Sequence, residues 1–196
     1  MTNTCLLIID LLHDFLDPWE QGARADLIAS TNGLVACFRK AGLPIIWVRQ
    51  AFKPDLSDAF LEMRKQNVHM TIEGTRGAEI HSDLDCQPQD AVITKKRYSA
   101  FFRTDLEDRL AEADITELVI CGINTHACIR MAVIDAYQRD YRVILPRECI
   151  GSYSEEHSRI SLEYMDGKLA QVLPVDEVRR RLANPTAMVP IDTRHT

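Results

Sequence analysis

Short apolar runs that end at a polar residue alternate along this chain with segments of helical periodicity. The clearest run is CLLIID, Cys5 to Asp10, a continuous apolar stretch that stops at an acid. A run without alternation between polar and apolar residues is typical of a strand that is buried on both faces. Such strands, separated by helices, predict an α/β fold of three layers, in which helices cover both faces of a six-stranded, mainly parallel sheet.

The remaining strands and helices are expected in alternation after the first run. The strands are PIIWVR (44–49), DAVITK (90–95), ELVICGI (117–123), YRVILP (141–146) and LAQVLP (169–174). Helical periodicity or composition marks 27–38, 105–113, 129–136, 155–165 and 175–182, and Gly42 followed by Pro44 closes the first of these.

Two segments do not follow the alternation. Residues 51–89 are the least regular, with a short helix expected near 58–67 and a loop at EGTRGAEI. The last residues contain Pro185 and Pro190 and are expected to form an extended tail that packs on a neighbouring subunit. We therefore expect a single domain over residues 1–183 and a tail over residues 184–196.

Composition excludes several classes of partner. Of the 196 residues, 46% are hydrophobic and 27% are charged, and the formal net charge is -6. Basic residues are scattered apart from Lys95-Lys96-Arg97, so no nucleic-acid-binding surface is expected. The first residues, MTNTCLLIIDLL, lack the basic start of a secretory signal, and no apolar run is long enough to span a bilayer. We expect a cytoplasmic protein that binds neither nucleic acid nor membrane.

Six cysteines are spread along the chain without a CxxC pair: Cys5, Cys37, Cys86, Cys121, Cys128 and Cys149. Without a secretory signal, this spacing predicts free thiols. Cys5, Cys37 and Cys121 lie in apolar runs, where cysteine packs as a small hydrophobic residue. Cys128 differs, because it follows the strand 117–123 at the point where a helix is expected to begin.

Three side chains with useful chemistry are expected at one edge of the sheet. Asp10 ends the first strand, Lys95 ends the third, and Cys128 opens the helix after the fourth. Sites in open parallel sheets form outside the carboxyl ends of the strands. The predicted fold therefore brings Asp10, Lys95 and Cys128 close together.

The position of Cys128 predicts a reactive thiol. Asn124 or Thr125 can cap the helix and place Cys128 in its first turn, where unpaired amides and the positive end of the helix dipole favour a thiolate. The amides of Ala127 and Cys128 can then donate to the oxyanion that forms when the sulfur attacks a carbonyl carbon. One turn is thus expected to supply both a nucleophile and an oxyanion hole.

Asp10 is the candidate base for this thiol, and Lys95 is the candidate partner that stabilises both charges. Each residue alone has a simpler interpretation. Cys128 can be a buried structural cysteine, Asp10 an acid that caps a turn, and Lys95 part of a solvated basic run with Lys96 and Arg97. We favour the catalytic interpretation because the three residues occur together.

Three motifs, CLLIIDLLHDF, KKRYSAFFRTDL and CGINTHACIRMAVIDAY, carry a resemblance to a known family. They resemble the isochorismatase-like cysteine hydrolases, whose pattern is a strand-ending Asp, a K-x-x-x-S-A-F-x-x-T-x-L block and a G-x-x-T-x-x-C helix start. EGTRGAEIHSDL and EEHSRISL are also similar to that family, so the resemblance covers nearly the whole chain.

The resemblance implies a role for each matching residue. Asp10 matches the base, Lys95 the electrostatic partner and Cys128 the nucleophile. Lys95 is chosen over Lys96 because it stands four residues before Ser99 of the SAF block. The resemblance also implies a cis peptide bond at residues 123–124, between Ile123 and Asn124, and a homo-oligomer, either a dimer or a tetramer.

Polar and aromatic residues near the strand ends are candidates for the substrate pocket, although each can equally serve ordinary packing. Arg49, after the second strand, offers a two-pronged site for a substrate carboxylate, and Arg76 or Arg97 can play the same part. The full set of candidates is Phe15, Trp19, Arg49, Tyr98 and Phe101.

No metal or other cofactor is expected. Nicotinamidases of the same superfamily carry a metal whose Asp-x-His pair follows the second strand, but here that stretch reads WVRQAF, with no carboxylate or imidazole. No HxH or HExxH spacing occurs, so we expect surface or core histidines rather than ligands at His13, His69, His81, His126 and His157.

The resemblance leaves three functions open. True isochorismatases, which cleave a vinyl ether without a thiol, carry a non-nucleophilic residue at the position of Cys128. The cysteine favours a metal-independent hydrolase that cleaves a C–N bond of a small amide, carbamoyl or ureido substrate through a thioester, as N-carbamoylsarcosine, ureidoacrylate, biuret and maleamate hydrolases do. The alternatives are a vinyl ether hydrolase with Asp10 as general acid, and a non-catalytic or redox-sensing relative in which a low-pKa Cys128 is oxidised.

Overall fold

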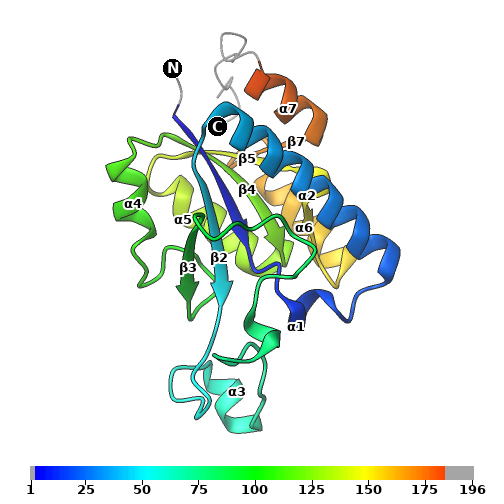
Figure 1. Cartoon of the computed structure of the whole chain (residues 1–196), viewed down its shortest axis with the longest axis vertical. Coiled ribbons are helices and arrows are strands. Elements are labelled where there is room, and N and C mark those ends of the chain that lie inside the picture. The colour runs from blue at the N-terminus through cyan, green and yellow to red at the C-terminus, as the bar shows by residue number, and fades with distance from the viewer. Residues whose placement is uncertain (1–2, 184–196) are drawn as a thin grey trace.

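A parallel sheet runs through the centre of the computed structural model, which describes residues 3–183 (Figure 1). Its strands are β1 (Thr4–Ile9), β2 (Ile45–Gln50), β3 (Ala91–Lys95), β4 (Glu117–Ile123), β5 (Arg142–Pro146), β6 (Ile150–Gly151) and β7 (Gln171–Leu173). Six of them follow the order β3-β2-β1-β4-β5-β7, and β6 pairs with β4. All of these pairings are parallel. The predicted fold is confirmed, with β6 as an additional short strand; the predicted tail lies outside the described residues.

Helices cover both faces of the sheet. On one face, called here the α2 face, lie α1 (His13–Leu16), α2 (Gln21–Ala41) and α7 (Val175–Ala183). On the other, the α5 face, lie α4 (Leu106–Glu112), α5 (Arg130–Tyr137) and α6 (Glu155–Met165). Short turns of 3-10 helix, η1 (Arg76–Ala78) and η3 (Arg147–Cys149), and a π-helical turn, η2 (Thr125–Ile129), connect these elements.

The apolar strands fill two cores, one on each face. Along β1, Leu7 and Ile9 pack with the helices of the α5 face, and Leu6 and Ile8 pack with those of the α2 face. All six residues of β1 and all seven of β4 are buried. This double burial explains why the strand sequences are continuously apolar.

The irregular segment after β2 builds a small core of its own from Phe52, Leu56, Ala59 and Ile72. Its helix α3 (Leu61–Gln66) lies beyond the carboxyl ends of β2 and β3 (Figure 1). Lys96 ties the segment to β3, since its Nζ lies 2.6 Å from the Ala51 carbonyl oxygen, 2.6 Å from Glu73 and 2.9 Å from Asp58. A separate core and ion pairs thus hold in place the part of the chain whose sequence was least regular.

Gly122 allows β1 and β4 to approach at the site edge. Its φ of 120° lies in a region that L side chains rarely adopt, and a Cβ at this position would lie 1.9 Å from the Ile9 carbonyl oxygen. We expect Gly122→Ala to destabilise the protein by about 2–4 kcal/mol, measured by urea unfolding. Gly42→Ala is the matched control, because Gly42 also has a positive φ but has no atom within 4 Å of the added Cβ. Equal losses for both variants would contradict the steric explanation.

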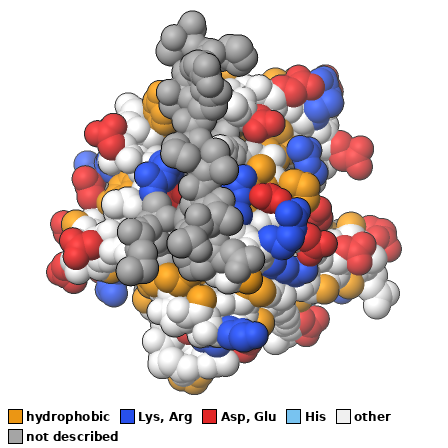
Figure 2. Space-filling model, turned by 90° about the horizontal axis from the view of Figure 1, so that it is seen from above, with side chains coloured by type: hydrophobic (Ala, Val, Ile, Leu, Met, Phe, Trp, Pro, Cys, Tyr) orange, Lys and Arg blue, Asp and Glu red, His pale blue; other side chains and the backbone are white. Residues whose placement is uncertain are grey.

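The surface is mixed in charge where it can be seen. Figure 2 views the molecule from above Figure 1, and the described residues on that face intersperse acidic and basic side chains. No helix within residues 3–183 has the length and hydropathy required to cross a membrane. All six cysteines are free thiols, as predicted.

Candidate active site

Asp10, Lys95 and Cys128 meet at the carboxyl edge of the sheet. The Lys95 ammonium lies 2.6 Å from Asp10 Oδ2 and donates to Cys128 Sγ at 3.4 Å. Exposure is 1% for Asp10, 0% for Lys95 and 6% for Cys128, so the three groups are nearly removed from water. A buried lysine between a carboxylate and a thiol is a strong electrostatic arrangement, because little solvent screens its charge.

Asp10 keeps unused acceptor capacity. Its backbone has a φ of 58°, in the left-handed region, at the point where the chain leaves β1. Lys95 approaches Oδ2 as an ion pair, yet neither carboxylate oxygen accepts an aligned hydrogen bond from any described group. A buried carboxylate with free lone pairs can accept a proton from a neighbouring group.

Cys128 lies in the π-helical turn η2, which precedes α5, and not in a regular first α-turn. The Asn124 carbonyl oxygen accepts two amides of this turn, from Ala127 at 3.0 Å and from Ile129 at 3.2 Å. The Ala127 amide was expected to donate to an oxyanion, but in this structure its N–H already donates to the Asn124 carbonyl oxygen. The Cys128 amide stays a candidate donor, and π-turns of this kind recur at functional sites.

The predicted side-chain caps are also replaced. Neither Asn124 nor Thr125 caps the turn with its side chain. Instead, Thr125 donates its hydroxyl to the Gly151 carbonyl oxygen at 2.9 Å, and Asn124 Oδ1 accepts the Tyr153 amide at 3.4 Å. The turn is thereby fastened to β6 and the residues after it, and the peptide bond between Ile123 and Asn124 is cis, at the position implied by the family pattern.

Burial raises the pKa of the Cys128 thiol. The Asp10 carboxylate raises this pKa further, and Lys95 lowers it by less. The expectation that the helix start lowers this pKa is therefore wrong for the resting state. Burial similarly raises the pKa of Cys5, to about 12, so what distinguishes Cys128 is its contact with Lys95 rather than its acidity.

Lys95 remains a cation in this setting. Burial by itself lowers the pKa of a lysine, but the facing Asp10 and Cys128 raise it by more, and the net pKa lies above the ordinary value. Its Nζ also donates to the Arg97 carbonyl oxygen at 3.1 Å. The neighbouring Lys96 binds the segment after β2 instead, so only Lys95 of the two lysines contacts Asp10 and Cys128.

Arg49, a candidate for the substrate pocket, lies on the face of the sheet opposite to Lys95, and its neighbour Gln50 lies on the same face as Lys95. Arg49 lies on the α2 face with Trp47, opposite to Lys95, and its Nε donates to Thr94 at 3.1 Å. Gln50 lies beside Lys95 in register and is 6% exposed, and its Nε2 donor has no partner among residues 3–183. The alternation of Ile46, Val48 and Gln50 could have identified this residue, because successive strand side chains point to opposite faces.

The aromatic pocket candidates are dispersed. Phe15 and Trp19 pack against the core of the α2 face. Phe101 is 5% exposed and stacks on Tyr141 in the core of the α5 face. Tyr98 is half exposed, with its ring centre 5.0 Å from that of Phe60. Their part in a substrate pocket stays a prediction.

A surface groove lies next to Trp19, outside the three-residue site. Its volume is about 840 Å³, and Gly151, Ser152, Arg159 and Glu163 are among its lining residues. None of Asp10, Lys95 and Cys128 lines it. The groove therefore offers no direct route to the thiol.

His126 fastens the nucleophile turn at its exposed side. Its Nδ1 lies 2.7 Å from Ser152 Oγ and its Nε2 lies 3.2 Å from the Tyr153 hydroxyl. Burial lowers its pKa, and the nearby His157 lowers it further.

This shift predicts how stability depends on pH. Because the folded pKa of His126 lies below the unfolded value of about 6.5, the unfolded state binds more protons, and stability falls as pH drops below that value. We expect His126→Gln to show a smaller decrease in its urea unfolding midpoint between neutral and acidic pH than the parent. An unchanged slope in this variant would contradict the assignment.

Two histidines that spacing did not connect come together beside α1. His13 and His81 both lie 3.3 Å from Asp17 Oδ1, in the one group of the described residues whose geometry could hold a metal ion. They come from segments far apart in the sequence, so no local motif could reveal the cluster. The suitability of the cluster for a metal ion depends on which ring nitrogens of His13 and His81 carry protons.

Comparison with known proteins places this geometry among hydrolases. The model of the family described as the isochorismatase domain matches residues 4–177. Phenazine biosynthesis protein PhzD1 from Pseudomonas aeruginosa is 32% identical over 177 residues, which cover 88% of this chain and 83% of that protein. Maleamate amidohydrolase from Pseudomonas putida is 27% identical over 182 residues, which cover 90% of this chain and 85% of the relative.

A solved structure agrees over nearly the whole length. The isochorismatase family protein from Desulfovibrio vulgaris superimposes with a TM-score of 0.84 at 26% identity, covering 94% of this chain and all of that one (100%). The two proteins thus share the same arrangement of sheet and helices.

Proposed function

The chain belongs to the isochorismatase family of hydrolases, and on this basis we propose that it is a metal-independent cysteine hydrolase of small amide, carbamoyl or ureido compounds. The observation that carries the proposal is the contact of one buried lysine, Lys95, with both Asp10 and Cys128. A vinyl ether hydrolase has no need of a thiol at this position. A thiol in contact with a buried cation, which also holds a carboxylate base, suits acyl transfer.

The reaction begins with the neutral thiol. When the substrate carbonyl displaces the remaining water, Asp10 takes the Cys128 proton and the sulfur attacks the carbonyl carbon, with Lys95 stabilising the transferred charge. The Cys128 amide donates to the oxyanion of the tetrahedral intermediate. Asp10 then returns the proton to the leaving nitrogen, so that ammonia or an amine departs and a thioester remains on Cys128.

The second half of the reaction uses the same base. Asp10 accepts a proton from water as the water oxygen attacks the thioester carbon. When the C–S bond breaks, Asp10 returns this proton to the departing sulfur, which restores the Cys128 thiol and the Asp10 carboxylate and releases the product acid. Lys95 balances the charge of the carboxylate in both halves, since it lies 2.6 Å from Asp10. The buried Gln50 amide beside it is available to orient the polar part of the substrate.

A relative that acts on an amide supports this assignment. Maleamate amidohydrolase aligns with 90% of the chain. A second candidate, vinyl ether hydrolysis with Asp10 as general acid, is supported by similarity to a probable isochorismatase from Pseudomonas chlororaphis at 27% identity over 174 residues. Amide hydrolysis by this mechanism requires the Cys128 thiol, and vinyl ether hydrolysis does not.

The test is ammonia release from a panel of carbamoyl, ureido and primary amide compounds, with isochorismate assayed in parallel for ether cleavage. Our account predicts ammonia from at least one amide-type compound and none from the Cys128→Ala variant. Ether cleavage that survives in Cys128→Ala, with no ammonia from any compound, would replace the proposal with the second candidate.

A further inference from the structure

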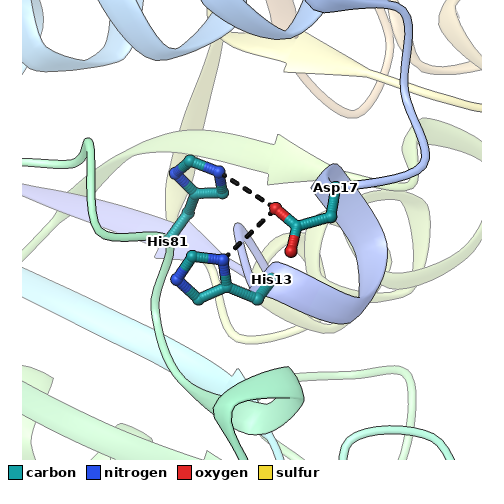
Figure 3. A group of neighbouring side chains, drawn as sticks. All are labelled: His13, Asp17 and His81. Carbon is teal, nitrogen blue, oxygen red and sulfur yellow. Dashed lines mark hydrogen bonds and ion pairs between the residues drawn. The ribbon is translucent and has the colours of Figure 1, made fainter.

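Two imidazoles and a carboxylate form a compact cluster close to the start of α1 (Figure 3). His13 Nδ1 and His81 Nε2 each lie 3.3 Å from Asp17 Oδ1, and the ring centres are 4.5 Å apart. Both histidines are buried, at 3% and 5% exposure, while Asp17 reaches the surface. The mechanism above does not use any of these side chains.

The far ring nitrogens determine where the protons lie. The Ser82 amide donates to His13 Nε2 at 3.2 Å, and the Asp83 amide donates to His81 Nδ1 at 3.2 Å. A nitrogen that accepts an amide hydrogen carries no proton of its own. Each neutral ring therefore has its N–H on the near side, at His13 Nδ1 and at His81 Nε2. The His13 N–H forms a hydrogen bond with Asp17 Oδ1, and His81 Nε2 lies 3.3 Å from the same oxygen.

These tautomers argue against a metal ion at the cluster. A histidine that binds a metal usually donates its other ring N–H to an acceptor. Here the other nitrogen of each ring faces a donor, and the near nitrogens carry the protons. The Asp17 carboxylate instead faces positive charge, because Arg76 lies 3.3 Å from its Oδ2 and Arg24 lies 3.9 Å from its Oδ1.

The cluster holds the segment that immediately follows Asp10. The Leu11 carbonyl oxygen accepts the His81 amide at 2.9 Å, and the His13 amide donates to the Glu79 carbonyl oxygen at 3.1 Å. Leu12 pairs with Ile80 in an antiparallel bridge between these bonds. The backbone of residues 79–81 thus runs along residues 11–13, and the side chains of the cluster fasten the two segments together.

We propose that His13, Asp17 and His81 are positioning residues for Asp10. The His13–Asp17 hydrogen bond, the polar contact of His81 with Asp17 and the backbone bonds between residues 11–13 and 79–81 form a metal-free lock that keeps residues 11–13 in place. This fixes the left-handed turn that presents the Asp10 carboxylate to Lys95 and Cys128. The proposal rests on the proposed function in that it gives Asp10 a catalytic role. Its test needs no substrate.

The first part of the test reads the protons directly. Nitrogen-15 NMR of the histidine rings should show His13 neutral with its proton on Nδ1 and His81 neutral with its proton on Nε2, at neutral pH. Zinc chloride at a slight excess should leave these signals and the unfolding temperature unchanged. The opposite tautomers, or zinc-dependent stabilisation that is lost in Asp17→Asn, would overturn the lock.

The second part of the test uses the apparent pKa of the Cys128 thiol to detect whether the Asp10 carboxylate has moved. The rate of Cys128 alkylation by iodoacetamide, followed by peptide mass spectrometry against pH, gives an apparent thiol pKa. The Asp10 carboxylate raises the pKa of Cys128, so its displacement should lower that apparent value. We expect Asp17→Asn and His81→Leu to lower it by about one unit, in the direction of Asp10→Asn.

Two further variants separate positioning from general destabilisation. His81→Gln keeps a donor that can reach Asp17 and should return the apparent thiol pKa toward that of the parent. Val178→Ala removes core packing on the α2 face and should leave it unchanged. A parental thiol pKa in Asp17→Asn, or an equal shift in Val178→Ala, would overturn the positioning role. If only the ammonia assay fails, the proposed function is contradicted and the positioning role is not.

Discussion

Replacement of Cys128 by alanine is expected to reduce amide hydrolysis by about 10,000-fold or more, because it removes the sulfur on which we propose that the acyl intermediate forms. The substitution deletes one sulfur from a buried site and leaves the Asp10–Lys95 ion pair intact. We therefore expect the variant to fold and to bind substrate. Steady-state ammonia release, with binding measured by calorimetry, checks both statements.

The matched control for this variant is Cys37→Ala, which removes a half-buried free thiol from α2. It should retain parental turnover. If Cys128→Ala keeps more than about one hundredth of the parental rate, the thiol is not the nucleophile. If Cys37→Ala loses activity to the same extent, the effect of Cys128→Ala cannot be assigned to its position beside Lys95.

Replacement of Lys95 by methionine is expected to affect both stability and activity. The side chain is 0% exposed and pairs with an Asp10 carboxylate that has no aligned hydrogen bond from another described group. Removing one partner of such a pair leaves an uncompensated buried charge, which costs about 3–5 kcal/mol of the free energy of unfolding. Loss of charge stabilisation during thioester formation should lower turnover by on the order of 1,000-fold.

The adjacent lysine provides the control for this second experiment. Lys96→Met removes the same charge one residue away, where the ammonium is partly exposed and binds Asp58 and Glu73. Urea unfolding and ammonia release should show a much smaller effect of Lys96→Met than of Lys95→Met. Comparable losses in the two variants would contradict the central role of Lys95.

The residues at the strand ends could be predicted because topology alone brings them together. Asp10, Lys95 and Cys128 each follow an apolar strand or its turn, and parallel strands present their carboxyl ends at one edge. The length and burial of β1 and β4 could also be predicted, because each strand is an unbroken apolar run. No side-chain detail is needed for either conclusion, and the structure places all three residues in contact.

The details of the nucleophile turn were not readable in the same way. The sequence predicts a regular α-turn after Asn124, but the Asn124 carbonyl oxygen accepts hydrogen bonds from the amides of Ala127 and Ile129 in a π-turn. The acidity of the thiol was also misjudged, because the position of Cys128 at a helix start is visible in a sequence and its burial is not. Arg49 lies within β2 and not after it, so the face of the sheet to which it points could be assigned only once the end of the strand was known.

The other features that the sequence did not predict depend on contacts between segments that are far apart in the chain. His13 and His81 lie in segments that share no motif, and they meet only because residues 79–81 pair with the chain after Asp10. The structure of the segment after β2 could not be predicted, because the residues of its small core, around Phe52 and Ile72, follow neither strand nor helix periodicity. Such features depend on tertiary packing, which local patterns do not encode.

The central claim is that Cys128 forms an acyl intermediate. Rapid acid quench of the enzyme during turnover of a compound that releases ammonia, followed by peptide mass spectrometry, measures this directly. The account predicts the mass of the substrate acyl group on the peptide that contains Cys128, sensitive to hydroxylamine and absent from Cys128→Ala. Ammonia release at the parental rate with no acyl group on Cys128 at any quench time, under conditions where acyl-group hydrolysis is slowed by low pH, would contradict it.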